Sequence, residues 1–97
     1  MGLKGFKIRL TPEAARFIAK LDSENRKTIR QALDEIRQQP YLGYDLQEEL
    51  SGFRSVRSKR YRIIYKVDDP GKSIDVYLVG HRRDVYEQLG VLLRRLT

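Results

Sequence analysis

Four side chains in the second half of the sequence have the types needed for chemistry on a phosphodiester, namely Arg62, His81, Arg82 and Tyr86. Cleaving RNA without a metal requires a base for the ribose 2′-hydroxyl, cations to stabilise charge on the phosphorane, and an acid for the 5′-oxygen. Arginine can supply the cation, and histidine, or less readily tyrosine, can supply the proton transfers. Tyrosine can also stack on a splayed base of single-stranded RNA.

Each of these residue types also has a purely structural interpretation. A strand arginine can pair with a surface carboxylate, and a lone histidine after a strand is commonly an ordinary exposed side chain. A tyrosine can anchor a helix through its ring, and Tyr61, Tyr65 and Tyr77 stand at positions suited to packing in a sheet. Residue types alone leave both interpretations open.

The positive charge of the chain, +7 in total, is concentrated in its second half. Residues 1–50 hold nine Lys/Arg against eight Asp/Glu, whereas residues 51–97 hold eleven against five. Clustered cations attract phosphates and release counterions on binding, which favours nucleic acid over a solvated strand surface. Anionic lipid is a weaker alternative, because no amphipathic basic helix or lipidation motif accompanies the cations. The predicted RNA-binding residues are Arg54, Arg57, Lys59, Arg60 and Arg83.

The composition of the chain limits the kinds of site and the cellular locations that it can have. With no cysteine and one histidine, a disulfide framework and a thiolate metal site are excluded and a zinc centre nearly so. We therefore expect neither a metal nor a cofactor. No stretch reaches the length that crosses a bilayer, and the N-terminus lacks the apolar core of a signal peptide. We expect one domain over residues 1–97 in the cytoplasm, with no membrane association.

The first half of the chain predicts a strand and a helical hairpin. Residues 6–10 alternate apolar and basic side chains, the period of a half-buried strand. Thr11-Pro12 then favours a helix start, and Asp22-Ser23 offers a cap for a second helix that ends before Pro40. The apolar stripes of the two helices are Ala14, Phe17, Ile18 and Leu21, and Ile29, Ala32, Leu33 and Ile36.

The second half predicts an antiparallel meander and a final helix. Residues 53–57, 59–67 and 73–80 have strand character, and residues 68–71 form a turn. Residues 41–52 lack a clean period and are interpreted as a loop with room for one turn of helix. Asp84 with Glu87 resembles a capping box for the C-terminal helix. The apolar stripe of that helix is Val85, Leu89, Leu92, Leu93 and Leu96.

Together these elements predict an α+β fold: an N-terminal strand, a two-helix hairpin, a three-stranded antiparallel meander joining that strand in one sheet, and a C-terminal helix. The hairpin can cover one face of the sheet. Strand alternation places Arg60, Arg62, Ile64 and Lys66 on the other face. We expect part of that face to stay open and to form the candidate site.

Two segments, YRIIYKVDD at 61–69 and VGHRRDVY at 79–86, resemble the signature of the RelE branch of the RelE/ParE toxin superfamily. The order of elements is similar along nearly the whole chain, which implies one toxin domain over residues 1–97. The resemblance further implies a toxin of a toxin–antitoxin pair that is an endoribonuclease, cleaving mRNA in the ribosomal A site. Arg62 matches the strand arginine that stabilises the phosphate and Arg82 a second phosphate-binding arginine, while Tyr86 matches the C-terminal tyrosine that orients the substrate.

The chain departs from the family pattern in its acid–base residues. Well-known members place lysines along the strand where this chain has Arg54, Val56 and Arg57, and arginine is a poor acid at neutral pH. His81 stands where some relatives have lysine. Because the pKa of an unperturbed histidine is about 6.5, His81 is the leading candidate for proton transfer.

The resemblance also implies partners: a cognate antitoxin, the ribosome with mRNA, and operator DNA through the antitoxin complex. An exposed leucine stripe on the C-terminal helix would suit an acidic antitoxin segment that folds on binding. Two other functions remain open: a ParE-like, non-enzymatic inhibitor of DNA gyrase, and a stand-alone RNA-binding module. The cluster from His81 to Tyr86 favours the ribonuclease, because an inhibitor that acts through protein contacts needs no phosphate-sized site.

Overall fold

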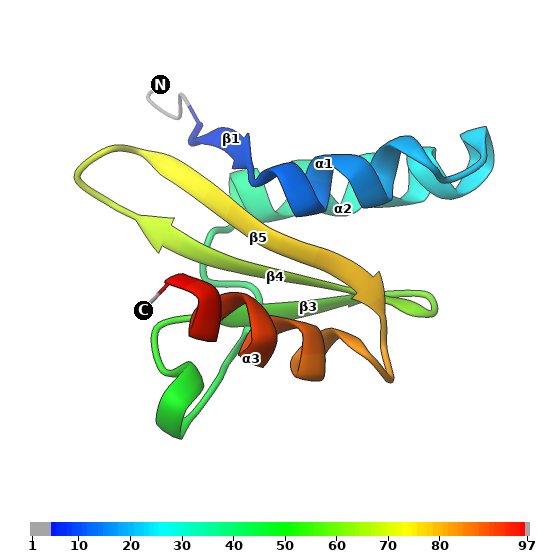
Figure 1. Ribbon diagram of the computed structural model, residues 1–97. Helices are drawn as coiled ribbons and strands as arrows, with labels where there is room; N and C mark the ends of the chain where they lie inside the picture. The colour runs from blue at the N-terminus through cyan, green and yellow to red at the C-terminus, as the bar shows by residue number, and fades with distance from the viewer. Residues whose placement is uncertain (1–4, 97) are drawn as a thin grey trace.

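A five-stranded mixed sheet organises the chain, with helices on both of its faces (Figure 1). The computed structural model describes residues 5–96. Its elements are β1 (Lys7–Leu10), α1 (Pro12–Ala19), α2 (Ser23–Gln38), β2 (Tyr44–Asp45), a 3₁₀ turn (Glu48–Leu50), β3 (Arg54–Ser58), β4 (Tyr61–Asp68), β5 (Ser73–His81) and α3 (Val85–Leu96). The strand order is β1-β5-β4-β3-β2, with β1 parallel to β5 and the other pairs antiparallel. The predicted α+β arrangement is confirmed.

The helical hairpin begins and ends at the predicted signals. The Thr11 side chain accepts a hydrogen bond from the backbone N–H of Ala14 at 3.1 Å, which caps α1. Asp22 caps α2 in the same way, accepting from the N–H of Asn25 at 3.2 Å. The second helix ends at Gln38, ahead of Pro40, because the ring of a proline disfavours helical geometry in the residue before it.

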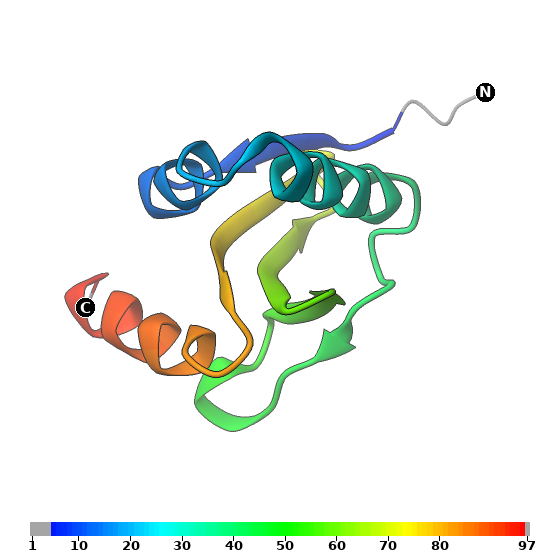
Figure 2. The ribbon, with the colours of Figure 1, turned by 90° about the vertical axis from the view of Figure 1, so that its right-hand side faces the viewer.

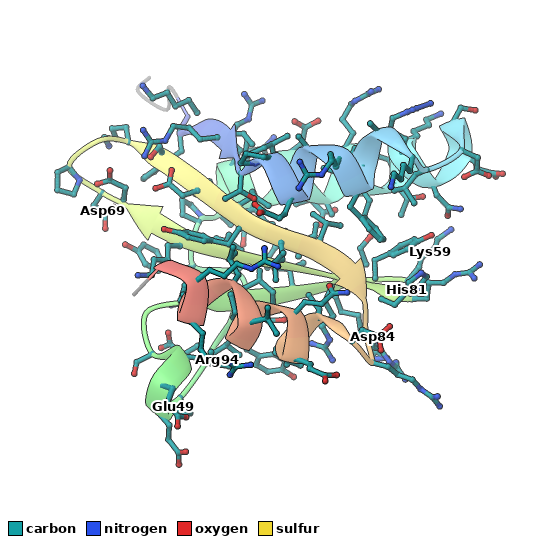
Figure 3. The ribbon with its side chains drawn as sticks, in the orientation of Figure 1. Glu49, Lys59, Asp69, His81, Asp84 and Arg94 are labelled. Carbon is teal, nitrogen blue, oxygen red and sulfur yellow. The ribbon has the colours of Figure 1, made fainter. Side chains whose placement is uncertain are left out.

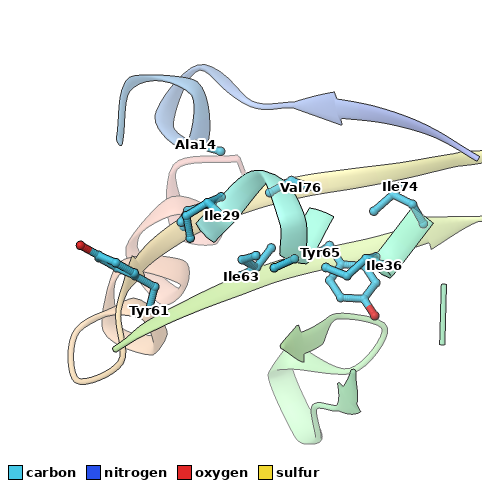
Figure 4. Packing of buried hydrophobic residues seen from close by; sticks show 10 residues of the cluster. Ala14, Ile29, Ile36, Tyr61, Ile63, Tyr65, Ile74 and Val76 are labelled. Carbon is cyan, nitrogen blue, oxygen red and sulfur yellow. The ribbon is translucent and has the colours of Figure 1, made fainter. Parts of the chain in front are cut away.

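The larger core lies between this hairpin and the sheet (Figures 2 and 4). Ile29 and Ile36 of α2 are fully buried against Ile63 and Tyr65 of β4 in this core. Burial of such side chains, each contributing roughly 1.5–3 kcal/mol, fixes which face of β4 points inward. Since strand side chains alternate, the residues between them point to the opposite face.

The smaller core lies on that opposite face, under α3 (Figure 2). Leu89 is fully buried and Leu92 is 8% exposed, both packed with Ile64 and Leu78 of the sheet. The expectation of an exposed leucine stripe on this helix is therefore wrong at these two positions, because the stripe covers the sheet. Leu93 is half-buried and packs against the same core, while the side chain of Leu96 lies outside the described part of the chain.

Two local predictions need correction. The segment predicted as a loop contains a two-residue edge strand, β2, which pairs with β3, in addition to the 3₁₀ turn. Arg60 does not share the pleated face of Arg62, because Ser58 pairs with Tyr61 and leaves residues 59–60 as a two-residue hairpin turn. Lys59 adopts a φ of 56° in this turn, the left-handed conformation that such tight turns require.

Candidate nucleic-acid interface

Three side chains from three different elements meet beside the N-terminal end of α3. Ser55 lies on β3, Arg62 on β4 and Tyr86 in the first turn of α3. The Ser55 and Tyr86 hydroxyl oxygens are 2.9 Å apart, and Nη1 of Arg62 donates to Oγ of Ser55 at 3.4 Å. The Arg62 guanidinium carbon lies 5.9 Å from the centroid of the Tyr86 ring. We call Ser55, Arg62 and Tyr86 the phosphate cluster.

The register of β3 and β4 adds a second cation to the same face. Arg57 is the cross-strand partner of Arg62, so the two arginines stand directly opposite each other. Like charges in this position repel and destabilise a sheet. Arg57 is exposed and Arg62 half-buried, and no carboxylate within residues 5–96 forms an ion pair with either. A bound polyanion would relieve this repulsion.

Arg62 has hydrogen-bonding capacity that the described protein atoms do not use. Its Nε is buried and has no hydrogen-bond partner among residues 5–96. Buried donors in native proteins are nearly always paired, so such an exception calls for an explanation. The guanidinium is a planar fork suited to two oxygens of one phosphate. The half-buried guanidinium of Arg62, without an ion pair among residues 5–96, therefore suits an anionic ligand on the α3 face of the sheet.

His81 lies on the other side of the sheet. It pairs with Tyr61 across β4 and β5, and its ring lies 5.3 Å from the Tyr61 ring and 5.9 Å from that of Phe17 on α1. Arg62 pairs instead with Gly80, one residue earlier, so its side chain points to the opposite face. The structure brings Arg62 and Tyr86 together but does not bring His81 to them.

A second group of cations surrounds His81 at the end of the sheet where β4 begins and β5 ends. A shallow hollow there is lined by Lys59, Arg60, His81, Arg82, Arg83 and Asp84. Figure 3 shows Lys59 and His81 at this end of the sheet, away from the Asp69 turn. The backbone N–H of Arg82 donates to the carbonyl of Arg60 at 3.0 Å, which ties the two turns together. We call this hollow the turn surface.

Arg54 occupies a structural position away from both surfaces. It pairs across the sheet with Tyr65, donates to the carbonyl of Gly43 at 2.9 Å, and forms an ion pair with Asp45 at 3.0 Å. Its guanidinium also lies over the ring of Tyr41, 5.1 Å from the centroid. The side chain predicted to bind RNA is thus engaged in holding the loop after α2 to the sheet.

The same loop contains or contacts two tyrosines whose pKa values are raised, Tyr41 and Tyr65. The Tyr65 hydroxyl donates to the carbonyl of Pro40 at 2.8 Å and accepts from the N–H of Gly43 at 3.0 Å, while burial raises the pKa of Tyr65. A hydrogen bond to Asp69 raises the pKa of the Tyr41 hydroxyl. A Cβ at Gly43 would lie 2.8 Å from the carbonyl oxygen of Ser55, so this loop packs directly on β3. These tyrosines therefore have structural roles.

Sequence reasoning missed Ser55, because an isolated serine in a strand carries no chemical signature. A signal existed in the register: Ser55 and Arg57 share a face in β3, and that face joins the one carrying Arg62. Within residues 5–96, no three His, Asp or Glu side chains gather in a way that could hold a metal ion. No helix in this part of the chain has the length and apolarity needed to cross a membrane.

Known proteins resemble this chain in sequence as well as in fold. Residues 8–86 match the family described as the ParE toxin of the type II toxin–antitoxin system parDE. Toxin RelG of Mycobacterium tuberculosis is 29% identical over 85 residues, covering 86% of this chain and 98% of that protein.

Two solved structures resemble the fold along most of the chain. The toxin–antitoxin complex RelBE2 of Mycobacterium tuberculosis contains a chain 29% identical to this one, with a TM-score of 0.73, covering 80% of this chain and 99% of the other. The isolated Escherichia coli RelE toxin has the same fold at 22% identity, with a TM-score of 0.68 over 95% of this chain and 99% of its own. The chain therefore belongs to the ParE toxin family of type II toxin–antitoxin systems, within the RelE/ParE toxin superfamily.

Proposed function

We propose that this toxin is a metal-independent endoribonuclease that cleaves mRNA in the ribosomal A site and so inhibits translation. The observation that carries the proposal is the phosphate cluster: a half-buried arginine without an ion pair among residues 5–96, beside a tyrosine and directly opposite a second arginine. A repulsive arginine pair costs stability, and a phosphodiester bound between the two would offset that cost.

The reaction assigned to the cluster is an internal transfer at phosphorus. The ribose 2′-oxygen forms a bond to phosphorus, the bond to the 5′-oxygen breaks, and the products are a 2′,3′-cyclic phosphate and a 5′-hydroxyl. One proton leaves the 2′-hydroxyl and one reaches the 5′-oxygen. Arg62 stabilises the charge that builds on the phosphorane oxygens. Tyr86 lies beside Arg62, so its phenol is the group to which we assign proton transfer at that phosphate.

The turn surface has a different role in this proposal. Lys59, Arg60, Arg82 and Arg83 offer exposed cations for the backbone of the RNA, and His81 offers an exposed ring. Contacts to phosphates position a nucleic acid without reading its sequence. The acid–base role predicted for His81 from sequence stays untested. Because the His81 ring packs on the face opposite Arg62, this proposal gives proton transfer to Tyr86 and RNA binding to His81.

The test is a reconstituted translation reaction programmed with a defined message. We expect the purified toxin to cut the message only when ribosomes are present, leaving a 2′,3′-cyclic phosphate on the upstream fragment. Arg62→Ala should abolish most of the cutting. Arg30→Ala is the matched control, because Arg30 is an exposed arginine on α2, away from the cluster. An intact message together with loss of gyrase supercoiling would replace this proposal with the ParE-like inhibitor.

The family places this toxin in a system with an antitoxin, and the basic surface indicates what kind of segment binds it. We expect a mostly disordered acidic segment that folds on the toxin, covers Arg62, and so keeps RNA away. A groove between α1 and α3 offers Phe17, Val91 and Leu92, and its charged lining has three cations, Arg16, Lys20 and Arg95, against two carboxylates, Glu13 and Glu87. Operator DNA would be bound through the resulting complex.

Co-expression tests this partner. Growth arrest by the toxin alone should be relieved when the neighbouring gene is expressed with it, and the two proteins should copurify. A chain that is harmless when expressed alone, and whose Arg62→Ala variant grows no differently, would contradict the toxin assignment itself.

A further inference from the structure

Ser55 is the one polar residue of β3 whose side chain is sealed inside the α3 face of the sheet. It is 1% exposed, and its cross-strand partner on β4 is the fully buried Ile64. A buried hydroxyl costs stability unless it is hydrogen-bonded, typically about 1–3 kcal/mol in mutational series. The hydroxyl of Ser55 meets this requirement only through the two other members of the phosphate cluster, Arg62 and Tyr86, among residues 5–96.

The chemistry of these groups sets the direction of the hydrogen bonds. A guanidinium can only donate, so Oγ of Ser55 accepts from Nη1 of Arg62. The serine hydroxyl has one proton of its own, and the only acceptor within reach among the described residues is the Tyr86 oxygen, 2.9 Å away. If Tyr86 donated instead, the buried Ser55 proton would be left without an acceptor. The arrangement in which both the oxygen and the proton of the Ser55 hydroxyl are hydrogen-bonded runs from Arg62 to Ser55 to Tyr86.

We infer that Ser55 is a positioning residue for the reaction, because it donates its proton to the Tyr86 oxygen and so directs the Tyr86 proton away from the protein, toward the open face. The inference rests on the proposed function, in which Tyr86 serves a phosphate held by Arg62. Ser55 itself is buried and touches no substrate. Its effect on cleavage passes mainly through the orientation of the Tyr86 phenol, because the hydrogen bond that it accepts from Arg62 is the longer of its two, at 3.4 Å against 2.9 Å.

A purely structural Ser55 would behave differently. If it only filled space in the smaller core, its loss would lower the free energy of unfolding and leave the cleavage rate of the folded protein unchanged. If it positions Tyr86, its effect on the rate must vanish once the Tyr86 hydroxyl is gone. This dependence is a coupling between two sites, which a double-mutant cycle measures.

The experiment is such a cycle with Ser55→Ala and Tyr86→Phe, in single-turnover cleavage of mRNA on saturating ribosomes. We expect Ser55→Ala to slow cleavage about tenfold in the wild-type background, the size of one hydrogen bond of about 1.4 kcal/mol, and less than twofold in the Tyr86→Phe background. Tyr86→Phe keeps the ring beside Arg62, so only the hydroxyl changes. Ser55→Thr, which keeps the hydroxyl on a β-branched strand residue, should restore most of the rate. Equal fold-losses in both backgrounds would overturn the inference.

Ser58→Ala is the matched control, because Ser58 is on the same strand and pairs with Tyr61 on the hairpin side of the sheet. A second measurement does not require cleavage. In ¹³C-tyrosine-labelled protein, Ser55→Ala should shift or broaden the ring signals of Tyr86 and leave those of Tyr61 and Tyr65 in place. Unchanged Tyr86 signals would overturn the inference whatever the activity. If the wild type cuts no RNA and the Tyr86 signals still respond, the hydrogen bond from Ser55 to Tyr86 stands and the proposed function fails.

Discussion

The two faces of β4 carry polar side chains in different environments, one closed and one partly open to solvent. On the hairpin face, Tyr61 and Tyr65 are buried in the larger core, and the Tyr65 hydroxyl is used by backbone groups of the loop after α2. On the α3 face, Arg62 is half-buried, and its Nε has no hydrogen-bond partner in the part of the chain that the structure describes. Strand alternation alone separates these environments, since neighbouring residues of one strand point in opposite directions. In the proposed function, stability and ligand chemistry therefore belong to different faces of the same strand.

Partial cover by α3 makes this separation possible. The helix seals Ile64 and Leu78 with its leucines, yet it begins only at Val85, so the part of the sheet around Arg57 and Arg62 keeps contact with solvent. The hairpin, in contrast, covers its face with two helices. A face that is only partly covered can hold charged groups at a lower desolvation cost than a closed core.

The largest effect is expected from a change in the larger core, which tests whether the hairpin face contributes to stability alone. Ile63→Ala on the hairpin face should lower the free energy of unfolding by roughly 2–5 kcal/mol, because it leaves a cavity beside fully buried neighbours. The cleavage rate per folded molecule should stay close to that of the wild type. Urea denaturation gives the stability, and Ile63→Val, expected to cost about 0.5–1.5 kcal/mol, serves as the graded control. A rate loss in the folded variant would show that the two faces are coupled.

The next largest effect is expected on the α3 face. Arg62→Ala should slow cleavage on the order of a hundredfold, about 2.7 kcal/mol, because its charge is needed when the phosphorane forms. The free energy of unfolding should stay equal or rise, since the change removes the repulsion between Arg57 and Arg62. Ribosome binding, measured by cosedimentation, should be largely retained. A variant that loses stability and activity in parallel would give Arg62 a structural role instead.

A variant of His81 tests directly whether the hairpin face of the sheet takes part in the reaction. Since its ring packs on Tyr61 and Phe17, we expect His81→Gln to weaken substrate binding about threefold and to leave the rate at saturation nearly unchanged. The measurement is single-turnover cleavage against ribosome concentration, repeated from pH 5 to 9. A much larger drop at saturation, together with loss of one limb of the pH–rate profile, would place His81 in the reaction and contradict the separation of faces.

Particular residues show how far sequence reasoning reached. Local rules sufficed for Thr11 and Asp22, because a helix cap depends on residues three positions apart. They could not reveal that Ser55 contacts Tyr86, since the two are 31 residues apart and meet only through the packing of α3 on the sheet. The prediction that Arg60 shares a strand face with Arg62 was wrong for a similar reason. The position of the turn between β3 and β4 depends on how the two strands pair, and this pairing leaves Arg60 in the turn. Alternation in β4 correctly separated Arg62 from the buried tyrosines, and it would have separated Arg62 from His81 had the register with β5 been known.

A smaller effect is expected from the exposed cations. Replacing both Arg57 and Arg60 with Gln should reduce the slope of log affinity against log salt by roughly 0.7 for each phosphate of single-stranded RNA that the variant no longer neutralises. Ribosome or RNA binding at several salt concentrations measures the slope. Lys27→Gln with Arg30→Gln is the matched control, because both residues are exposed on α2, at the hairpin side. Equal salt slopes in the two double variants would mean that the cations of α2 contribute to binding as much as Arg57 and Arg60 do.

The smallest effect is expected far from either surface, at the edge where β1 pairs with β5. Nε of Arg9 donates to Asp75 at 2.8 Å, and Ser73 donates to the same carboxylate at 2.9 Å. These contacts, with Arg9 the largest cause, hold the pKa of Asp75 below its usual range. A lowered pKa in the folded state contributes stability that is present above the unfolded value near 4 and is lost as pH falls through the folded value.

Asp75→Asn should therefore lower the urea midpoint slightly at pH 7, and the difference from the wild type should shrink as the pH falls from about 5 toward 2.5. The effect is small because Arg9 is mostly exposed and solvent screens the pair. Asp34→Asn is the control, since the Asp34–Arg37 ion pair on α2 is longer, at 3.5 Å, and exposed on both sides. The cleavage rate at pH 7 should not change, because Asp75 pairs with Arg9 of β1, away from the phosphate cluster and the turn surface. A midpoint difference that is constant across this pH range would contradict a lowered pKa for Asp75, and a changed cleavage rate would extend the functional region to the far edge of the sheet.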